Sequence, residues 1–262
     1  MMDRICFGKL LLGGTSWIVP GTFAENMCEL SRETDSMMFV LFDGEYGCNI
    51  PDKAEISELV SLKKDLDMEV VVHFPRDICR SEDTEERRRC EDSCIRMMEL
   101  FEPLDPFGYI LHLDGEILGE YPSRNMTRWT ELTHASVLRL AAAASDKTKI
   151  CAETLDYNFR IAYPITEDTG ISICLDIGHL VRYGHNVAEQ MNLYMPTTRV
   201  IHIHGVSEDG TDHLDMSCFD AALFRDVTAK ANEDGKKRLM ILEVFEEDYK
   251  KSLNAIKKYM GA

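Results

Sequence analysis

The stretch ISICLDIGH at residues 171–179 decides the fold, because an apolar run typical of a buried strand ends in an aspartate and a histidine. The same pattern recurs in VVVHFP (70–75), YILHLDG (109–115), ICAETL (150–155), VIHIHG (200–205) and MILEVF (240–245). Buried parallel strands read as apolar runs, and a barrel of such strands gathers its functional groups at their C-terminal ends. The repetition therefore predicts parallel strands whose ends share one site.

Eight strands are predicted from apolar, β-branched-rich runs that turn residues delimit. They cover residues 10–16, 37–43, 68–74, 108–114, 149–154, 171–177, 199–205 and 239–245. Helical periodicity lies between them, for example at 53–66, 85–101, 125–145 and 218–232. Alternating strands and helices over 262 residues predict one (β/α)8 barrel domain spanning residues 1–262. Proline and glycine predict irregular structure at 15–22 and 157–170.

Charge and composition limit the partners. The formal net charge is −17, from 29 basic and 46 acidic residues, so an electropositive groove for nucleic acid is not expected. No segment approaches the roughly 20 apolar residues that cross a membrane, and the N-terminal stretch lacks the apolar region of a signal peptide. Nine scattered cysteines, an odd number, favour a reduced protein. We therefore expect a cytoplasmic protein that acts on a small molecule.

The acids and imidazoles at the strand ends predict a metal site. Carboxylates and histidines converging on one barrel mouth repel or strand one another unless a divalent cation pairs them. Glu153, Asp176, His204 and Glu243 are the expected core ligands, and this mixed set suits zinc or manganese. His202 shares a strand face with His204 and is the alternative ligand. The competing interpretation is that each acid caps a helix or binds a local amide.

Further histidines extend the predicted site. His73 and His112, at the ends of the third and fourth strands, are candidates for holding a second ion beside Glu153. His179, with Asp212 or His213, is a candidate for completing another site or contacting substrate. Alternatively, each of these histidines donates to a carbonyl or positions a substrate oxygen. Cys90 and Cys94 lie one helical turn apart, but no second pair of ligands stands near them in the sequence.

The strand-end set HFP, HLDG, AETL, CLDIGH, HIHG and LEVF resembles the xylose-isomerase-like barrel superfamily, which includes endonuclease IV and many sugar isomerases and epimerases. The resemblance implies that Glu153, Asp176, His204 and Glu243 bind the shared metal. The endonuclease-type branch adds histidines that match His73, His112 and His179. It also uses an aspartate and a histidine separated by one residue, whereas Asp212 and His213 are adjacent here.

A closer resemblance involves GGTSWIVPGTF, VLFDGEYGCNIPDKAEISEL, VVVHFPRDI and FEPLDPFGYILHLDG, followed by CLDIGHL and HIHGV. These segments are similar to the cobamide-remodelling phosphodiesterases and cover nearly the whole barrel. The resemblance implies metal-dependent hydrolysis of the phosphoribosyl linkage in the nucleotide loop of cobamides such as cobalamin and pseudocobalamin. Cobinamide phosphate and the lower-ligand riboside are the expected products, in a step that begins corrinoid salvage.

Roles follow for individual residues. Glu153 or Glu243 is expected to orient the attacking water, and His112 or His179 to protonate the leaving ribose oxygen. Trp17, Phe74 and Phe245, beside strand ends, offer apolar surface for a large corrinoid, and His213 is a further candidate for substrate binding. The residues expected to fill these roles therefore lie in both the metal core and the barrel mouth.

Two other functions remain open at this point. In a sugar isomerase or epimerase, Glu153 and Glu243 would flank the substrate carbon as an acid/base pair while the same metal holds its hydroxyls. The extra histidines weigh against that function. A non-catalytic binder built on the same barrel is the third possibility, and intact ligand types at every expected strand weigh against it.

Overall fold

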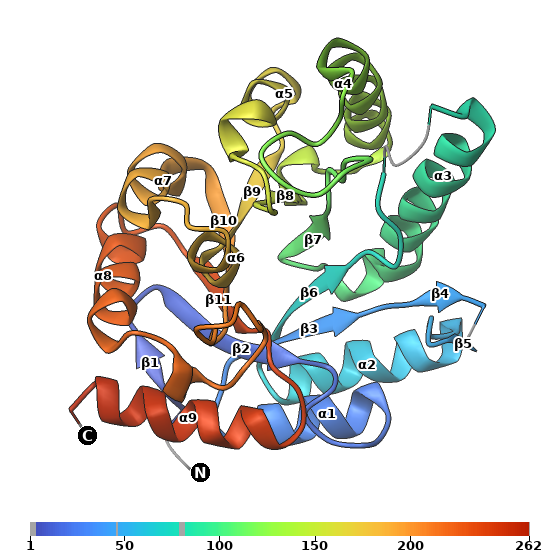
Figure 1. Cartoon of the computed structure of the whole chain (residues 1–262). Coiled ribbons are helices and arrows are strands. Elements are labelled where there is room, and N and C mark those ends of the chain that lie inside the picture. The colour runs from blue at the N-terminus through green and yellow to red at the C-terminus, as the bar shows by residue number, and fades with distance from the viewer. Residues whose placement is uncertain (1–3, 46, 79–81, 262) are drawn as a thin grey trace.

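Eight parallel strands form a closed ring with helices outside it (Figure 1). The computed structural model describes residues 4–45, 47–78 and 82–261. The barrel strands are β2 (Leu10–Thr15), β3 (Ser36–Val40), β6 (Glu69–His73), β7 (Gly108–Leu111), β8 (Ile150–Glu153), β9 (Ser172–Asp176), β10 (Thr198–Ile203) and β11 (Arg238–Leu242). Neighbours in sequence pair in parallel, and β2 closes the ring by pairing with both β3 and β11. The predicted (β/α)8 barrel and its eight strands are confirmed.

Most of the helices cover the outside of the barrel, whereas the short α6 overlaps the ring of strands in Figure 1. The described helices are α1 (Phe23–Leu30), α2 (Lys53–Asp65), α3 (Thr84–Phe101), α4 (Met126–Ala143), α5 (Tyr163–Thr169), α6 (Ile177–Arg182), α7 (Val187–Tyr194), α8 (Ala221–Asn232) and α9 (Glu247–Tyr259). Short strands β1 (Cys6–Phe7), β4 (Asp43–Gly44) and β5 (Gly47–Cys48) were not predicted, and β1 pairs antiparallel with β2. Five 3-10 turns complete the described elements: Glu102–Leu104, Lys147–Lys149, Phe159–Ile161, Met195–Thr197 and Met216–Cys218.

The prediction of irregular structure at 157–170 is wrong, because this segment contains a 3-10 turn and α5. Pro164 stands in the first turn of α5, where its missing N–H costs nothing, and Gly170 ends the helix with a φ of 72°. The two residues taken as breakers are the start and stop of a helix. At 15–22 the expected irregular loop is present, and Thr22 then caps α1.

One apolar layer lies on each side of the barrel sheet. The larger fills the space between strands and helices, while a smaller cluster fills the inside of the barrel. The inner cluster consists of Met38, Val71, Ile110, Cys151, Cys174, Val200, Leu239 and Ile241. Because side chains alternate along a strand, the residue two places further along from each of these also points inward. This alternation sets which strand-end residues meet at the mouth of the barrel.

Within the described ranges, no helix is both long and apolar enough to cross a membrane.

Candidate metal centre

The strand-end acids and imidazoles stand in register with the inner core. Each lies two residues beyond an inward-facing residue, as His73 follows Val71 and Asp176 follows Cys174. The full set placed in this way is His73, His112, Glu153, Asp176, His202 and Glu243. Strand alternation therefore directs six potential ligands from six strands or strand ends toward one region above the inner core.

The central group consists of Glu153, Asp176, His202 and Glu243, all buried. One donor atom from each lies within 4.8 Å of the others. His202 Nδ1 lies 3.3 Å from Glu153 Oε1, 3.1 Å from Glu243 Oε2 and 3.7 Å from Asp176 Oδ2. The imidazole grouped with the three carboxylates is thus the alternative His202, and His204 belongs to a neighbouring group.

A second group shares Glu153 with the first. His112 Nε2 lies 3.1 Å and His73 Nε2 3.7 Å from Glu153 Oε2, and the two imidazole nitrogens are 3.1 Å apart. The other oxygen of this carboxylate, Oε1, faces His202. One glutamate therefore presents an oxygen to each of two adjacent groups of candidate ligands.

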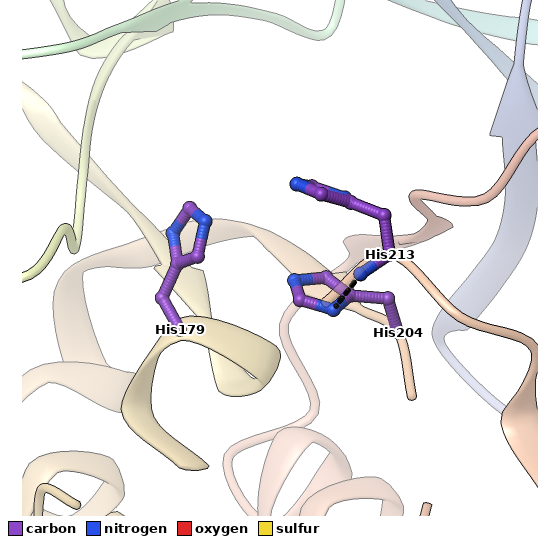
Figure 2. A group of neighbouring side chains, drawn as sticks. All are labelled: His179, His204 and His213. Carbon is purple, nitrogen blue, oxygen red and sulfur yellow. Dashed lines mark hydrogen bonds between the residues drawn. The ribbon is translucent and has the colours of Figure 1, made fainter. Parts of the chain in front are cut away.

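A third group consists of His179, His204 and His213, whose nitrogen donors also lie within 4.8 Å of one another. Figure 2 shows the three rings gathered around one space. The rings of His204 and His213 stack with centroids 4.3 Å apart, and that of His179 lies 5.6 Å from His204 and 6.0 Å from His213. Asp212 instead pairs with Arg182 and stands 3.9 Å from His213 Nε2.

Oxygen acceptors lie next to the Nδ1 atoms of four histidines. The Nδ1 atoms of His73, His179 and His213 lie 3.0, 3.1 and 3.1 Å from the carbonyl oxygens of Phe74, Thr154 and Glu243. His112 Nδ1 lies 3.0 Å from Asp77 Oδ1. We assign a proton to Nδ1 in these rings, so Nε2 is the nitrogen that a metal ion would bind. Metal-binding histidines are usually oriented in this way.

The sequence interpretation did not include Asp77. Its position four residues after His73, in the loop that follows the strand, was the available signal. Asp77 anchors the histidine of the next strand instead of its own. That partnership depends on how two βα loops meet, so it was not evident from local spacing.

Several buried polar atoms lack a hydrogen-bond partner among the described residues. They are Asp176 Oδ2, His202 Nε2, His204 Nε2 and Glu243 Oε2, together with seven atoms on other residues. An unpartnered buried polar group costs about 1–3 kcal/mol, and more when it is charged. Carboxylate and imidazole donors suit zinc or manganese, so the residues present fit a divalent cation.

Mutual charge keeps the acids ionised. Burial raises the pKa of Glu153, but His202 and His112 lower it, and the pKa lies well below its ordinary value. Burial likewise raises the pKa of Glu243, whereas His202 brings it down to about 2. For His202, burial lowers the pKa, but Cys174 and Glu243 raise it well above the ordinary value. The centre is therefore rich in buried charge and ready to exchange protons for a cation.

Asp176 combines a structural role with its place in the central group. Its Oδ1 accepts a hydrogen bond from the His179 amide at 2.7 Å and caps α6, while its own amide donates to Thr154 Oγ1 at 2.9 Å. The competing interpretation of the acids as helix caps is thus correct for this oxygen. Oδ2 remains without a hydrogen-bond partner among the described residues and faces His202.

The aromatic residues expected at the mouth fall into two environments. Trp17 and Phe245 are each 40% exposed, and Phe245 lies 6.1 Å from the ring of His213. Trp17 packs against Phe42, with centroids 5.8 Å apart. Phe74 is buried and stacks on Tyr109, because it follows the inward-facing His73 and points to the opposite side of the strand. Trp17 and Phe245 therefore offer exposed apolar surface, whereas Phe74 does not.

Cys90 and Cys94 form no metal-ligating group with other described residues, and the Sγ of Cys94 lies 3.7 Å from the Arg76 carbonyl oxygen.

Solved structures with the same fold include sugar epimerases and a nuclease. A D-tagatose 3-epimerase-like protein superposes with a TM-score of 0.77 at 20% identity, over 96% of this chain and 97% of that one. Endonuclease IV from Thermus thermophilus gives 0.69 at 16% identity, over 96% and 99% of the two chains. An L-ribulose 3-epimerase gives 0.69 at 17% identity, over 97% and 86%. Such low identities establish the fold alone.

No curated protein matches the sequence significantly. The family model for the xylose isomerase-like TIM barrel matches residues 35–259. This match spans most of the chain, from the start of the second barrel strand to the end of α9. With its closed ring of eight strands and its strand-end ligands, the chain belongs to the xylose isomerase-like TIM barrel family.

Proposed function

We propose that the chain is a divalent-metal-dependent phosphodiesterase that hydrolyses the phosphoribosyl linkage in the nucleotide loop of cobamides. One observation carries the hydrolytic part: the two oxygens of Glu153 face two separate groups of ligands. Two neighbouring cations clamp the attacking and leaving oxygens of a phosphoryl displacement. A shared carboxylate is one group that can hold two such cations side by side.

The ligands follow from the donor atoms. Asp176, His202 and Glu243 would hold one ion with Glu153, while His73 and His112 would hold a second with the same glutamate. When bound, zinc or manganese lowers the pKa of water and polarises a phosphoryl oxygen. The structure groups His202, in preference to His204, with the three carboxylates, so His202 takes the place of the expected ligand in this proposal.

The chain's other groups would orient the substrate and move protons. His179 and His213 have their Nδ1 atoms held by carbonyl oxygens, so their Nε2 atoms would be the ones to protonate a leaving oxygen. The half-exposed rings of Trp17 and Phe245 offer apolar surface for the corrin ring. The cobamide assignment itself rests on the resemblance of the loop segments, among them GGTSWIVPGTF and VVVHFPRDI.

An epimerase is the second candidate, favoured by the folds of the D-tagatose 3-epimerase-like protein and L-ribulose 3-epimerase. It would use Glu153 and Glu243 as the acid/base pair. The ligands His73 and His112 are an addition that a single-ion epimerisation does not need. We therefore rank hydrolysis first.

Product analysis tests the proposal. Zinc- or manganese-loaded protein is incubated separately with cobalamin, pseudocobalamin, their adenosylated forms and a set of free ketoses. Release of cobinamide phosphate and the lower-ligand riboside is the expected result. Unchanged corrinoid together with epimerised ketose would replace hydrolysis by the second candidate. The matched control is the Glu153→Gln variant, which should form neither product.

A further inference from the structure

The short helix α6 carries an arginine to the side of the third group of histidines. Arg182 is the last residue of this helix, three places after His179, and Tyr183 follows it. Residues three or four apart lie on the same face of a helix, so both share a face with His179. The rings of His179 and Tyr183 have centroids 6.2 Å apart, and the guanidinium carbon of Arg182 lies 5.1 Å from the centre of the Tyr183 ring.

The loop that follows β10 supplies the partner of this arginine. Asp212 Oδ2 forms an ion pair with Arg182 Nη1, and the same oxygen lies 3.9 Å from His213 Nε2. The loop reaches this place because Gly205 and Leu214 form an antiparallel bridge that brings its far end back to the barrel. One carboxylate oxygen therefore stands between the guanidinium and an imidazole of the third group.

Part of the guanidinium of Arg182 is available to a ligand. Arginine has five N–H donors in a planar fork, and Asp212 accepts from Nη1. Nε and Nη2 have no hydrogen-bond partner among the described residues. The Arg182 side chain is 34% exposed, whereas that of Asp212 is 15% exposed. Asp212 and the Tyr183 ring thus hold the guanidinium from two sides, and solvent reaches its remaining donors.

The charge of the barrel mouth favours a phosphate as that ligand. Glu153, Asp176 and Glu243 bring three carboxylates together there, in a chain with a net charge of −17. Negative charge of this kind repels an anionic substrate, and a positive group beside the site offsets the repulsion. The fork of an arginine can donate to two phosphate oxygens at once, whereas lysine acts as a point charge.

We propose that Arg182 binds the phosphoryl group of the substrate and so selects substrates that carry a phosphate. A neutral ketose would gain nothing from this contact. The inference rests on the proposed hydrolysis of a phosphodiester, but it does not depend on a cobamide being the substrate. The competing role is purely structural, because a cation in the last turn of a helix also stabilises that helix.

Three variants separate phosphate binding from the structural role. Arg182→Gln removes the charge and the fork, and Arg182→Lys keeps the charge alone. Arg89→Gln is the matched control, because Arg89 forms an exposed ion pair with Glu85 on α3. Calorimetry measures the binding of inorganic phosphate to zinc-loaded protein, and hydrolysis of bis(4-nitrophenyl) phosphate gives KM and kcat. Urea unfolding of each variant measures the contribution to stability.

Arg182→Gln should bind phosphate about 10- to 100-fold more weakly than the wild type, the usual effect of losing a hydrogen bond to a charged group. The KM for the diester should rise by a similar factor, with a much smaller change in kcat. Arg182→Lys should lie between these two proteins, and Arg89→Gln should match the wild type.

Absence of phosphate binding by the wild type, or equal phosphate affinity in the wild type and Arg182→Gln, would overturn the proposal. A loss of stability alone in Arg182→Gln, restored in Arg182→Lys, would assign the arginine to the structural role. Phosphate binding that depends on Arg182, without hydrolysis of the diester by the wild type, would refute the proposed function and leave this inference standing.

Discussion

Both ends of the barrel bury charged side chains, but the two ends differ in whether these side chains have all their hydrogen-bond partners. At the N-terminal end of β11, Arg238 is fully buried and has its donors satisfied: Nε by Thr198 O, Nη1 by Ala231 O and Asp234, and Nη2 by Met195 O and Asp234. At the other end of the same strand, Glu243 is buried with Oε2 lacking a hydrogen-bond partner among the described residues.

The comparison distinguishes a buried charge that stabilises the fold from buried charges that can still bind a ligand. Arg238 ties β11 to the turn before β10 and to the end of α8, and its distances of 2.7 to 3.1 Å leave it no capacity for a ligand. The acids at the C-terminal end instead contact imidazoles, and some of their oxygens still have the capacity to accept a hydrogen bond or bind a cation. In this family fold, the C-terminal end is where chemistry is expected and the N-terminal end contributes stability.

The largest effect is expected from Glu153→Gln, which removes the carboxylate that two ligand groups share. Cations contribute several kcal/mol to stabilising a phosphoryl transition state, so we expect roughly 10³-fold or greater loss of hydrolysis and loss of bound metal. Asp234→Asn, an equivalent change at the opposite end, is the control and should keep its metal. Full metal content in Glu153→Gln would show that the two groups do not share an ion-binding carboxylate.

Removing metal should have the next largest effect, on stability. A ligand that binds only the folded state at 1,000 times its dissociation constant adds about 4 kcal/mol to the free energy of unfolding. Urea unfolding of chelated and zinc-loaded protein measures this difference. The same experiment on Asp176→Asn should give a much smaller difference, and an equal difference in both proteins would place the stabilising ions elsewhere.

Arg238→Met tests the N-terminal end of the barrel, where the buried charge has all its hydrogen bonds. The substitution leaves the buried carbonyls of Thr198, Ala231 and Met195 without their donor, and we expect a loss of about 3 kcal/mol in the free energy of unfolding. Zinc stoichiometry should not change. A stable variant with reduced metal binding would contradict the division between the two ends.

The smallest effect is a release of protons on metal binding. The pKa values of His112 and His202 are raised well above the ordinary histidine value, chiefly because neighbouring acids and Cys174 outweigh the lowering by burial. Both imidazoles therefore hold an extra proton at neutral pH without metal, and an ion must displace it, so zinc affinity should rise with pH. Calorimetry in two buffers of different ionisation enthalpy measures the protons. Identical heats in the two buffers would rule this coupling out.

Much of the fold was predictable because its signals are local. Each barrel strand is an apolar run, and alternation along the strand is enough to bring His73, Glu153 and Asp176 toward one mouth. The same alternation leaves His202 and His204 on one face, and only the height of β10 in the ring decides which of them meets the three carboxylates. Phe74 was assigned to the mouth from its place beside a strand end, but its neighbour His73 takes the inward direction.

In the third group, His179 and His213 were sequence candidates for one site, but the way His204 joins them lay beyond local reasoning. His213 meets His179 and His204 because the loop at 205–214 folds back with a left-handed residue, a geometry that no spacing rule supplies. Asp77 similarly reaches His112 from the preceding βα loop. Both partnerships arise between loops that are distant in sequence. Loop packing determines them, whereas strand periodicity determines the core ligands.

Anomalous diffraction from crystals of zinc-loaded protein tests the central claim most directly. We predict one ion within about 2.0–2.3 Å of donor atoms from Glu153, Asp176, His202 and Glu243, and a second within the same range of His73, His112 and Glu153. Zinc-loaded crystals without anomalous density between these side chains, or with a single ion that Glu153 does not contact, would contradict the account.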